Sequence, residues 1–172
     1  MEKTYIMLKP DAVRRGLMGE IINKIERKGY QITAMKMFMM TPELLREHYA
    51  HIVDRPFYPE VEKYMLSGPV VGMVVEGENV IKGMRNFMGP TKYLDAPAGT
   101  IRGDYSCNDR ENLIHGSDAP ETAEAEIKRF FGPSSIEIKR LYLLDKVFCF
   151  CINLKIFVFL QVFKNLYFLF IF

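Results

Sequence analysis

Residues 4–40 read TYIMLKPDAVRRGLMGEIINKIERKGYQITAMKMFMM and predict a strand, a helix and a second strand. The apolar run Thr4–Lys9 is typical of a buried strand, because a proline and an aspartate end it. The next segment carries apolar residues at helical spacing: Met18, Ile21, Ile22 and Ile25. Tyr30–Met40 predicts the second strand. Its methionines are predicted to fill the core: Met35, Met37, Met39 and Met40.

The alternation of elements continues to residue 131. Turn signals and apolar spacing predict a helix through Tyr49, a helix around Pro59–Ser67, a strand over Val70–Glu76, a helix over 80–88, a polar loop over 90–112, a short strand over Asn112–His115 and a last helix from Asp118 to Phe131. The order predicts an α/β (α+β) protein, with a ferredoxin-like βαββαβ antiparallel sheet and helices on its faces.

The composition excludes several classes of protein. With 172 residues, 49% of them hydrophobic, the chain is long enough for one domain with a proper core. A net charge of +2 gives no general attraction for nucleic acid. Three cysteines do not make a disulfide framework, and no secretory signal opens the sequence, so we expect a cytoplasmic protein.

The C-terminal end differs from the rest of the chain. Val147–Phe172 contains no acidic residue and few polar ones, with Lys155 and Lys164 among them. These lysines interrupt the run of about 20 apolar residues that a membrane span needs. Because the composition is that of AT-rich codons, we interpret the segment as translated non-coding or frameshifted sequence, with membrane attachment as the second reading. The predicted division is a domain over 1–145 and an apolar extension over 146–172.

The strongest chemical signal is the segment Asn112-Leu-Ile-His-Gly-Ser-Asp118. It places His115 at the end of a strand and before a helix, beside free backbone N–H groups. A neutral imidazole is a nucleophile for phosphoryl groups when a hydrogen bond orients its other nitrogen. Glu126, eleven residues later, is the candidate for that carboxylate. The alternative is a structural histidine with satisfied hydrogen bonds.

Phosphoryl transfer also requires cations, because negative charge spreads over the transferred group. Lys9 ends the first strand, Arg85 lies on a helix, and Arg102 lies between glycines, where backbone and guanidinium can both approach a phosphate. Solvated charges and an ordinary turn are the alternatives. The chain has neither the P-loop pattern nor the Rossmann glycine pattern.

Several blocks carry a resemblance to a known family: Lys9-Pro-Asp-Ala-Val13, Arg15-Gly-Leu17, Glu47-His-Tyr49, Arg55-Pro-Phe57, Ser67-Gly-Pro-Val70, Gly99-Thr-Ile-Arg-Gly-Asp104 and Asn112-Leu-Ile-His-Gly-Ser-Asp118. These blocks, in their order and spacing over about residues 3–131, resemble those of nucleoside diphosphate kinases. The resemblance implies Mg²⁺-dependent, ping-pong transfer of a γ-phosphate between nucleoside tri- and diphosphates through a phosphohistidine. It also implies a homo-oligomer, a hexamer or tetramer.

The resemblance further implies roles for individual residues. His115 resembles the phosphorylated nucleophile and Glu126 its orienting partner. The remaining catalytic and nucleotide-binding positions are Lys9, Tyr49, Ser117, Phe57, Arg85, Thr91, Arg102 and Asn112, and Asp118 completes the histidine motif together with Ser117. Phe57 matches the ring on which the base stacks, and stacking tolerates any base. The resemblance implies no metal ligands from the protein, because the nucleotide phosphates hold the Mg²⁺.

Some of these residues have simpler readings. Without the resemblance, Phe57 would be interpreted as a core residue, and Tyr49 could be a residue on the surface of a helix. His48 and His51 are interpreted as structural, because neither has a partner at metal-ligand spacing in the sequence.

The sequence also departs from the family pattern. Lys92-Tyr93 follows Thr91 in place of Asn-Pro or Asp-Pro, in a loop that packs at subunit contacts in the family. Ala98 replaces a common proline, and residues 108–111 replace a stretch that gives the base an apolar contact. The apolar end of the chain is the largest departure.

Two other functions compete with the kinase. A non-catalytic member of the same fold would bind nucleotides or act as a scaffold, but a pure scaffold does not need His115, Lys9 and Arg102 together. A nucleic-acid binder is suggested by the ferredoxin-like sheet alone. The neutral body and the lack of an aromatic RNP-type segment argue against it.

Overall fold

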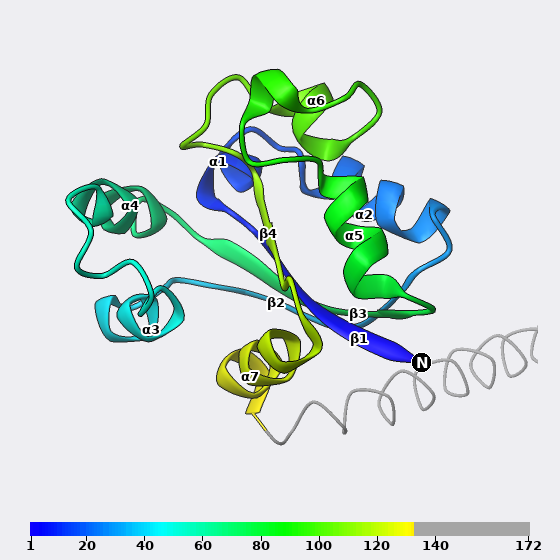
Figure 1. Cartoon of the computed structure of the whole chain (residues 1–172), viewed down its shortest axis with the longest axis horizontal. Coiled ribbons are helices and arrows are strands. Elements are labelled where there is room, and N and C mark those ends of the chain that lie inside the picture. Colours follow the sequence, from blue (N-terminus) through cyan, green and yellow to red (C-terminus); the bar gives the residue numbers. More distant parts are fainter. Residues whose placement is uncertain (133–172) are drawn as a thin grey trace, which may run out of the picture. The chain divides into compact units, whose positions relative to one another are not determined.

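A four-stranded antiparallel sheet in the order β2-β3-β1-β4 organises residues 1–132, the part of the chain that the structure, a computed structural model, describes (Figure 1). This is the predicted ferredoxin-like arrangement. The predicted boundary at residue 145 and the apolar extension lie outside the described residues. Among residues 1–132, no helix is long and apolar enough to span a membrane.

The two long strands at the centre of the sheet are buried along most of their length. β1 (Glu2–Leu8) pairs with β3 (Val70–Gly77) from Glu2 opposite Gly77 to Leu8 opposite Val71. On its other side β1 pairs with β4 (Ile114–Gly116), and β2 (Gln31–Phe38) extends the sheet beyond β3. β2 and β4 are therefore the two edges.

The α-helices follow the predicted positions, with two additions, and a 3₁₀ turn also forms in the predicted loop. They are α1 (Pro10–Arg14), α2 (Met18–Arg27), α3 (Pro42–His48), α4 (Tyr58–Met65), α5 (Val80–Met88), the 3₁₀ turn η1 (Tyr93–Asp95), α6 (Ile101–Tyr105) and α7 (Pro120–Phe131). Thr41 begins α3 as predicted, because its hydroxyl accepts the N–H of Leu44. The additions are α1 and α6, whose five residues each are too few to show a helical period in the sequence.

Alternate residues of β1 belong to two different apolar clusters. Ile6 and Leu8 pack with residues of α2 and α5 on one face of the sheet, whereas Tyr5 and Met7 pack with residues of α3, α4 and α7 on the other. Figure 1 shows α2 and α5 together on one side of the strands and α7 on the opposite side. The sheet is thus covered on both faces, which explains the continuous apolar run of β1.

The prediction that the four methionines between residues 35 and 40 fill the core is wrong for three of them. Met40 is buried, but Met35, Met37 and Met39 are 52%, 52% and 56% exposed. The physical reason is the position of β2 at the edge of the sheet. Met35 and Met37 continue the apolar face of their partners on β3 past the point where helices cover it.

Candidate active site

His115 lies on β4, next to the end of β1. In the strand register it stands opposite Met7, which packs in the cluster that includes residues of α3 and α7. Since paired residues of antiparallel strands point to the same face, the imidazole lies on the α3 and α7 side of the sheet. Its side chain is 24% exposed, so a ligand can reach the ring.

The carboxylate of Glu126, on α7, orients the His115 ring. Nε2 of His115 lies 2.7 Å from Oε1 of Glu126, and the hydroxyl of Ser117 donates to Oε2 at 2.6 Å. The Ser117 oxygen in turn accepts the backbone N–H of Tyr5 at 3.2 Å. A carboxylate at Nε2 keeps the proton on that nitrogen. Nδ1, which makes no hydrogen bond with any described residue, then carries a lone pair.

A strained turn sets the direction in which the chain enters β4. Leu113 has φ 69°, in the left-handed region, which costs a leucine about 1–2 kcal/mol. Its N–H donates to Oδ2 of the fully buried Asp11 at 3.2 Å, and its carbonyl accepts the backbone N–H of Lys9 at 2.8 Å. The end of β1 and the start of α1 therefore hold the turn from which His115 projects two residues later.

Lys9 and Asn112 form a polar pair beside this turn. The ammonium of Lys9 donates to Oδ1 of Asn112 at 2.6 Å, and Nδ2 of Asn112 donates to the carbonyl of Asp109 at 2.8 Å. Burial, followed by the positive charge of Arg102, lowers the pKa of Lys9 to about 8, against the opposing effect of Asp11. An ammonium with a depressed pKa gains from the arrival of an anion.

Arg102 lies on α6 and is 4% exposed. Its guanidinium donates to three backbone carbonyls, from Nε to Asn112 at 3.2 Å, from Nη1 to Gly89 at 2.7 Å and from Nη2 to Ile114 at 2.6 Å. Burial, followed by the charge of Arg85, lowers its pKa to about 10. Since a guanidinium has five N–H donors, two remain for another acceptor. Arg102 is thus a structural residue as well as a candidate ligand for phosphate.

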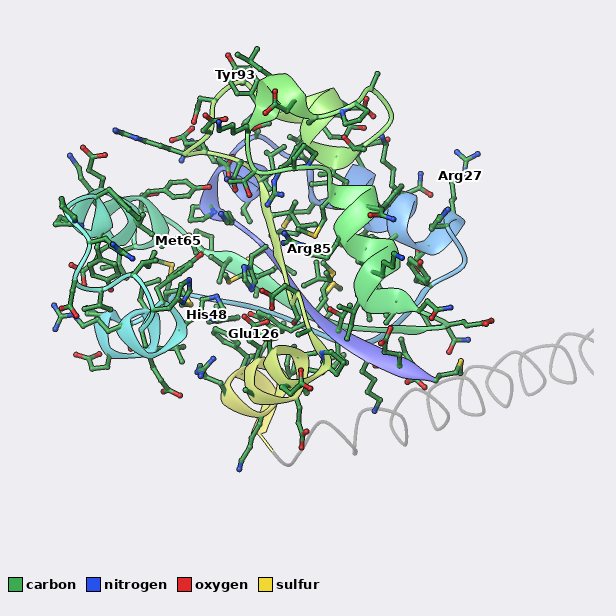
Figure 2. The ribbon with its side chains drawn as sticks, in the orientation of Figure 1. Arg27, His48, Met65, Arg85, Tyr93 and Glu126 are labelled. Atoms are coloured by element: carbon green, nitrogen blue, oxygen red, sulfur yellow. The ribbon has the colours of Figure 1, made fainter. Side chains whose placement is uncertain are left out.

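The other two candidate phosphate-binding residues lie more openly. Arg85, on α5, is exposed and places Nη1 3.5 Å from the carbonyl of Gly116 (Figure 2). Thr91 is exposed and makes no hydrogen bond with the described residues. The structure therefore brings Lys9, Arg85 and Arg102 to the segment 112–116 around His115, and it gives Thr91 no contact there.

Phe57 and Tyr49 come from the helical insertion between β2 and β3. Phe57 begins α4 and is 50% exposed, so the core reading of this residue is wrong and its ring is free to stack. Tyr49 ends α3 and is half-buried, with its ring 4.6 Å from that of His48. Burial, and then the negative charge of Glu126, raise the pKa of the Tyr49 phenol.

The loop over 108–111, which departs from the family pattern, is held by charged side chains. Arg110 pairs with Glu60 of α4 at 2.7 Å, and Glu111 pairs with Arg14 of α1 at 3.0 Å. Asp109 accepts the backbone N–H of Tyr93 at 2.9 Å. The loop next to Asn112 therefore has an ordered connection to α4, which Phe57 directly precedes.

One group in the described part of the chain has the spacing of metal ligands. Ligand atoms of His48, His115 and Glu126 lie within 4.8 Å of one another. The 2.7 Å between His115 and Glu126 is a hydrogen-bond distance, so a proton already satisfies this pair. The group is also rich in nitrogen, whereas Mg²⁺ takes oxygen ligands, so it is not a magnesium site.

Two residues of this site were not predicted from the sequence. Asp11 stood in a quoted block without a role, although an acidic residue directly after a buried strand was a usable signal. His48 was interpreted as structural, and its sequence position gave no sign that it contacts Glu126. Only the packing of α3 beside α7 brings them together (Figure 2).

Comparison with known proteins gives one family. The sequence profile described as nucleoside diphosphate kinase matches residues 2–136. A nucleoside diphosphate kinase of Streptomyces coelicolor is 54% identical over 131 residues, which cover 76% of this chain and 96% of the relative. One of Moorella thermoacetica is 48% identical over 136 residues, covering 79% of this chain and 98% of the relative.

Solved structures agree with this result. The crystal structure of the nucleoside diphosphate kinase from Encephalitozoon cuniculi is 42% identical, with a TM-score of 0.77, and covers 78% of this chain and 92% of its own. The structure of the nucleoside diphosphate kinase from Halobacterium salinarum, in complex with CDP, is 43% identical, with a TM-score of 0.76. It covers 78% of this chain and 90% of its own. Profile, relatives and fold agree, and the chain belongs to the nucleoside diphosphate kinase family.

Proposed function

We propose that His115 carries the phosphoryl group when this chain transfers the γ-phosphate of a nucleoside triphosphate to a nucleoside diphosphate. The observation that carries the proposal is the environment of its ring. Nε2 is bound to a buried carboxylate, and Lys9, Arg85 and Arg102 all contact the five residues around it. A fixed imidazole beside several cations suits phosphoryl transfer better than a structural role.

The reaction divides into two half-reactions at Nδ1. The lone pair of Nδ1 forms a bond to the γ-phosphorus while the bond from phosphorus to the bridging oxygen breaks, and the diphosphate leaves with that electron pair. An oxygen of the acceptor's terminal phosphate then attacks the phosphorus, and the Nδ1–P bond breaks. No proton leaves Nδ1, and the positive charge of the phosphorylated ring is balanced by Glu126.

Each remaining site residue has a proposed task in these steps. Lys9 and Arg102 neutralise charge on the transferring oxygens, and Arg85 and Thr91 bind the other phosphates. Asn112 and Tyr49 contact the ribose and the transferring group, while Ser117 holds Glu126. Phe57 stacks on the base, for which its half-exposed ring is suited.

We propose Mg²⁺ as the cofactor, held mainly by the phosphates of the nucleotide. The donor set of the site supports this, because the one ligand cluster found in residues 1–132 is nitrogen-rich and partly occupied by a hydrogen bond. When bound, the ion neutralises negative charge on the phosphate oxygens. The cations of the chain supply the rest of that neutralisation.

Nucleoside tri- and diphosphates are the proposed ligands. The relative from Halobacterium salinarum was solved in complex with CDP, a nucleoside diphosphate. For this chain the exposed ring of Phe57 supports base stacking, which does not select one base. We also propose a cytoplasmic location, where these nucleotides occur and where the free thiol of Cys107 stays reduced.

A homo-oligomer is the proposed assembly. β2 is an edge strand, so one side of its backbone has no partner strand in the described chain. Its exposed Met35 and Met37, and Met39 directly after the strand, add apolar surface along that edge. Both features support pairing with a second copy, and native mass spectrometry would give the number of subunits.

We propose that the chain divides into a kinase domain over 1–145 and an apolar extension over 146–172, as the sequence predicts. The end of the family match at residue 136 supports it. A variant truncated after Asp145 is expected to keep the fold and the activity.

The central experiment labels the protein with γ-³²P-ATP and no acceptor. An acid-labile, alkali-stable phosphoprotein is expected, and it should disappear in His115→Ala and persist in His51→Ala, which changes an exposed histidine. Adding a nucleoside diphosphate should discharge the label as triphosphate. Label that survives in His115→Ala would refute the role of His115, and a labelled protein that acceptors do not discharge would favour the non-catalytic alternative.

A further inference from the structure

His48 is a buried polar residue whose nitrogens have no hydrogen-bond partner. It lies at the end of α3, its side chain is 1% exposed, and neither Nδ1 nor Nε2 makes a hydrogen bond. Buried polar groups in native proteins are almost always paired, because the loss of water must be compensated. The residue therefore needs an explanation beyond the filling of space.

The ring points one nitrogen at the carboxylate that orients His115. Nδ1 of His48 lies 3.5 Å from Oε1 of Glu126, the same oxygen that lies 2.7 Å from Nε2 of His115. Figure 2 labels both His48 and Glu126 in this part of the molecule. The approach is longer than a normal hydrogen bond, and contacts of this kind in ligand-free enzymes often shorten when the substrate is bound.

Aromatic rings fix the orientation of His48 around this contact. Its ring packs edge to face against His115, with centroids 4.7 Å apart, and against Phe130 of α7, at 5.1 Å. Tyr5 of β1 lies at 6.4 Å and Tyr49 at 4.6 Å. With rings on these sides, Nδ1 stays directed at Glu126.

His48 is neutral at any pH at which the enzyme is expected to work. Burial lowers its pKa to about 2, and the charges of His115, Arg129, Lys9 and His51 act in the same direction. A neutral imidazole has one N–H and one bare nitrogen. A bare Nδ1 next to the carboxylate would be repelled by it, so the favoured tautomer carries its proton on Nδ1.

We propose that His48 is a positioning residue of the transfer reaction, whose Nδ1–H faces Oε1 of Glu126 and holds that carboxylate ionised and aligned with His115. This rests on the proposed role of His115. With donors from His48 and His115 on Oε1 and from Ser117 on Oε2, the negative charge stays on Glu126. The proton then stays on Nε2 of His115, and Nδ1 keeps the lone pair that attacks the phosphorus.

Three substitutions separate this role from space filling. In His48→Asn the amide nitrogen takes the place of Nδ1, in His48→Gln it takes the place of Nε2, and His48→Phe keeps the ring without nitrogen. We expect phosphorylation by ATP to slow about 10- to 100-fold in His48→Phe and His48→Gln. His48→Asn should stay within about threefold of the wild type despite its smaller volume. KM for ATP should change little in all three, because the side chain of His48 is only 1% exposed and is therefore not open to a nucleotide.

A structural role predicts the opposite order. A residue that only fills space would be best replaced by phenylalanine and worst by the smaller asparagine. Full activity in His48→Phe with reduced activity in His48→Asn overturns the proposal. The exposed His51→Phe is the matched control and should keep the wild-type rate.

A measurement on the unmodified protein keeps the test decisive if the variants fail to fold. Two-dimensional ¹H–¹⁵N NMR of the histidine side chains reports which nitrogen carries the proton. We expect the Nδ1–H tautomer for His48 and the Nε2–H tautomer for His115. An Nε2–H tautomer at His48 overturns the inference alone, whereas a wild-type protein that forms no phosphohistidine overturns the proposed function itself.

Discussion

Asp11 and Leu113 are joined by a hydrogen bond although 102 residues separate them in the sequence. The buried carboxylate accepts the N–H of a leucine in the left-handed region. Its other oxygen accepts the hydroxyl of Tyr64, from α4. Asp11 thus compensates the strain of the turn that leads to His115, and it links this turn to the helix that follows Phe57.

Asp11→Ala should therefore weaken both stability and catalysis. The N–H of Leu113 would lose its acceptor inside the protein, which costs roughly 1–3 kcal/mol in the free energy of unfolding. Urea unfolding and the rate of His115 phosphorylation measure the two effects. Tyr64→Phe, which keeps the Asp11–Leu113 bond, is the control and should leave that rate near the wild-type value. An equal loss of rate in both variants would contradict this account.

Glu126→Gln should slow phosphorylation without unfolding the protein. An amide can no longer balance the charge of the phosphorylated ring, and it does not fix the proton on Nε2 of His115. By analogy with other carboxylate–histidine pairs we expect a loss of about 10²- to 10⁴-fold. Rapid-quench measurement of phosphoprotein formation checks this. Glu124→Gln, on the exposed side of α7, should have no effect.

The activity should fall with rising pH as Lys9 loses its proton. Its pKa is lowered to about 8 from an ordinary value of 10.5, so in the free enzyme the positive charge is lost as the pH rises through about 8. kcat/KM for ATP, which reports the free enzyme, should therefore decline above that pH. In Lys9→Arg the decline should move to higher pH, because a guanidinium stays protonated. A decline at the same pH in this variant would assign it to another group.

Arg102→Lys should destabilise the fold as well as lower the activity. One ammonium cannot serve carbonyls of Gly89, Asn112 and Ile114 at three fixed positions. We expect a loss of roughly 2–4 kcal/mol in the free energy of unfolding, from buried acceptors left without donors. The exposed Arg110→Lys should cost far less, and calorimetry compares the two. A thermal midpoint unchanged in Arg102→Lys would contradict the structural role.

His48 should make the protein sensitive to acid. Its pKa is about 2 in the folded protein, against an ordinary value of 6.5 for an exposed histidine, so the unfolded chain binds the additional proton between these values. Stability is therefore lost as the pH falls below about 6.5, by up to about 1.4 kcal/mol per pH unit from this group. His48→Phe should show a shallower dependence between pH 6.5 and 4. Equal slopes in the two proteins would show that other groups control acid unfolding.

The sequence predicted the parts of the fold that follow from repeated local signals. α2 has apolar residues at helical spacing, and the Thr41-Pro42 cap marks the start of α3, so both were placed correctly. The helices α1 and α6 carry no such repetition. They are short helices held by contacts with distant segments. Lys9, directly before α1, donates its N–H to Leu113, and Arg102 of α6 donates to three backbone carbonyls.

Burial was harder to predict than secondary structure, because it depends on which strand reaches the edge. The methionines of β2 have the composition of a core, and only the strand order leaves Met35 and Met37 uncovered. Side-chain contacts between residues far apart in the sequence could not be predicted either. The motifs predicted the environment of His115, whereas the approach of His48 to Glu126 arises from the packing of two helices.

Arg85 and Arg102 affect whether a further strand can pair with the β4 edge of the sheet. The Leu113 carbonyl accepts the backbone N–H of Lys9, so in β4 the carbonyls of Ile114 and Gly116 point away from β1, whereas the Asn112 carbonyl already accepts the N–H of Ile114 within the turn. Arg102 donates to the carbonyl of Ile114 and Arg85 approaches that of Gly116, so both guanidinium groups stand where a further strand would have to bind. Within the described residues, the short edge strand β4 is thus shielded by the side chains of Arg85 and Arg102, which hinders the pairing of a further strand there.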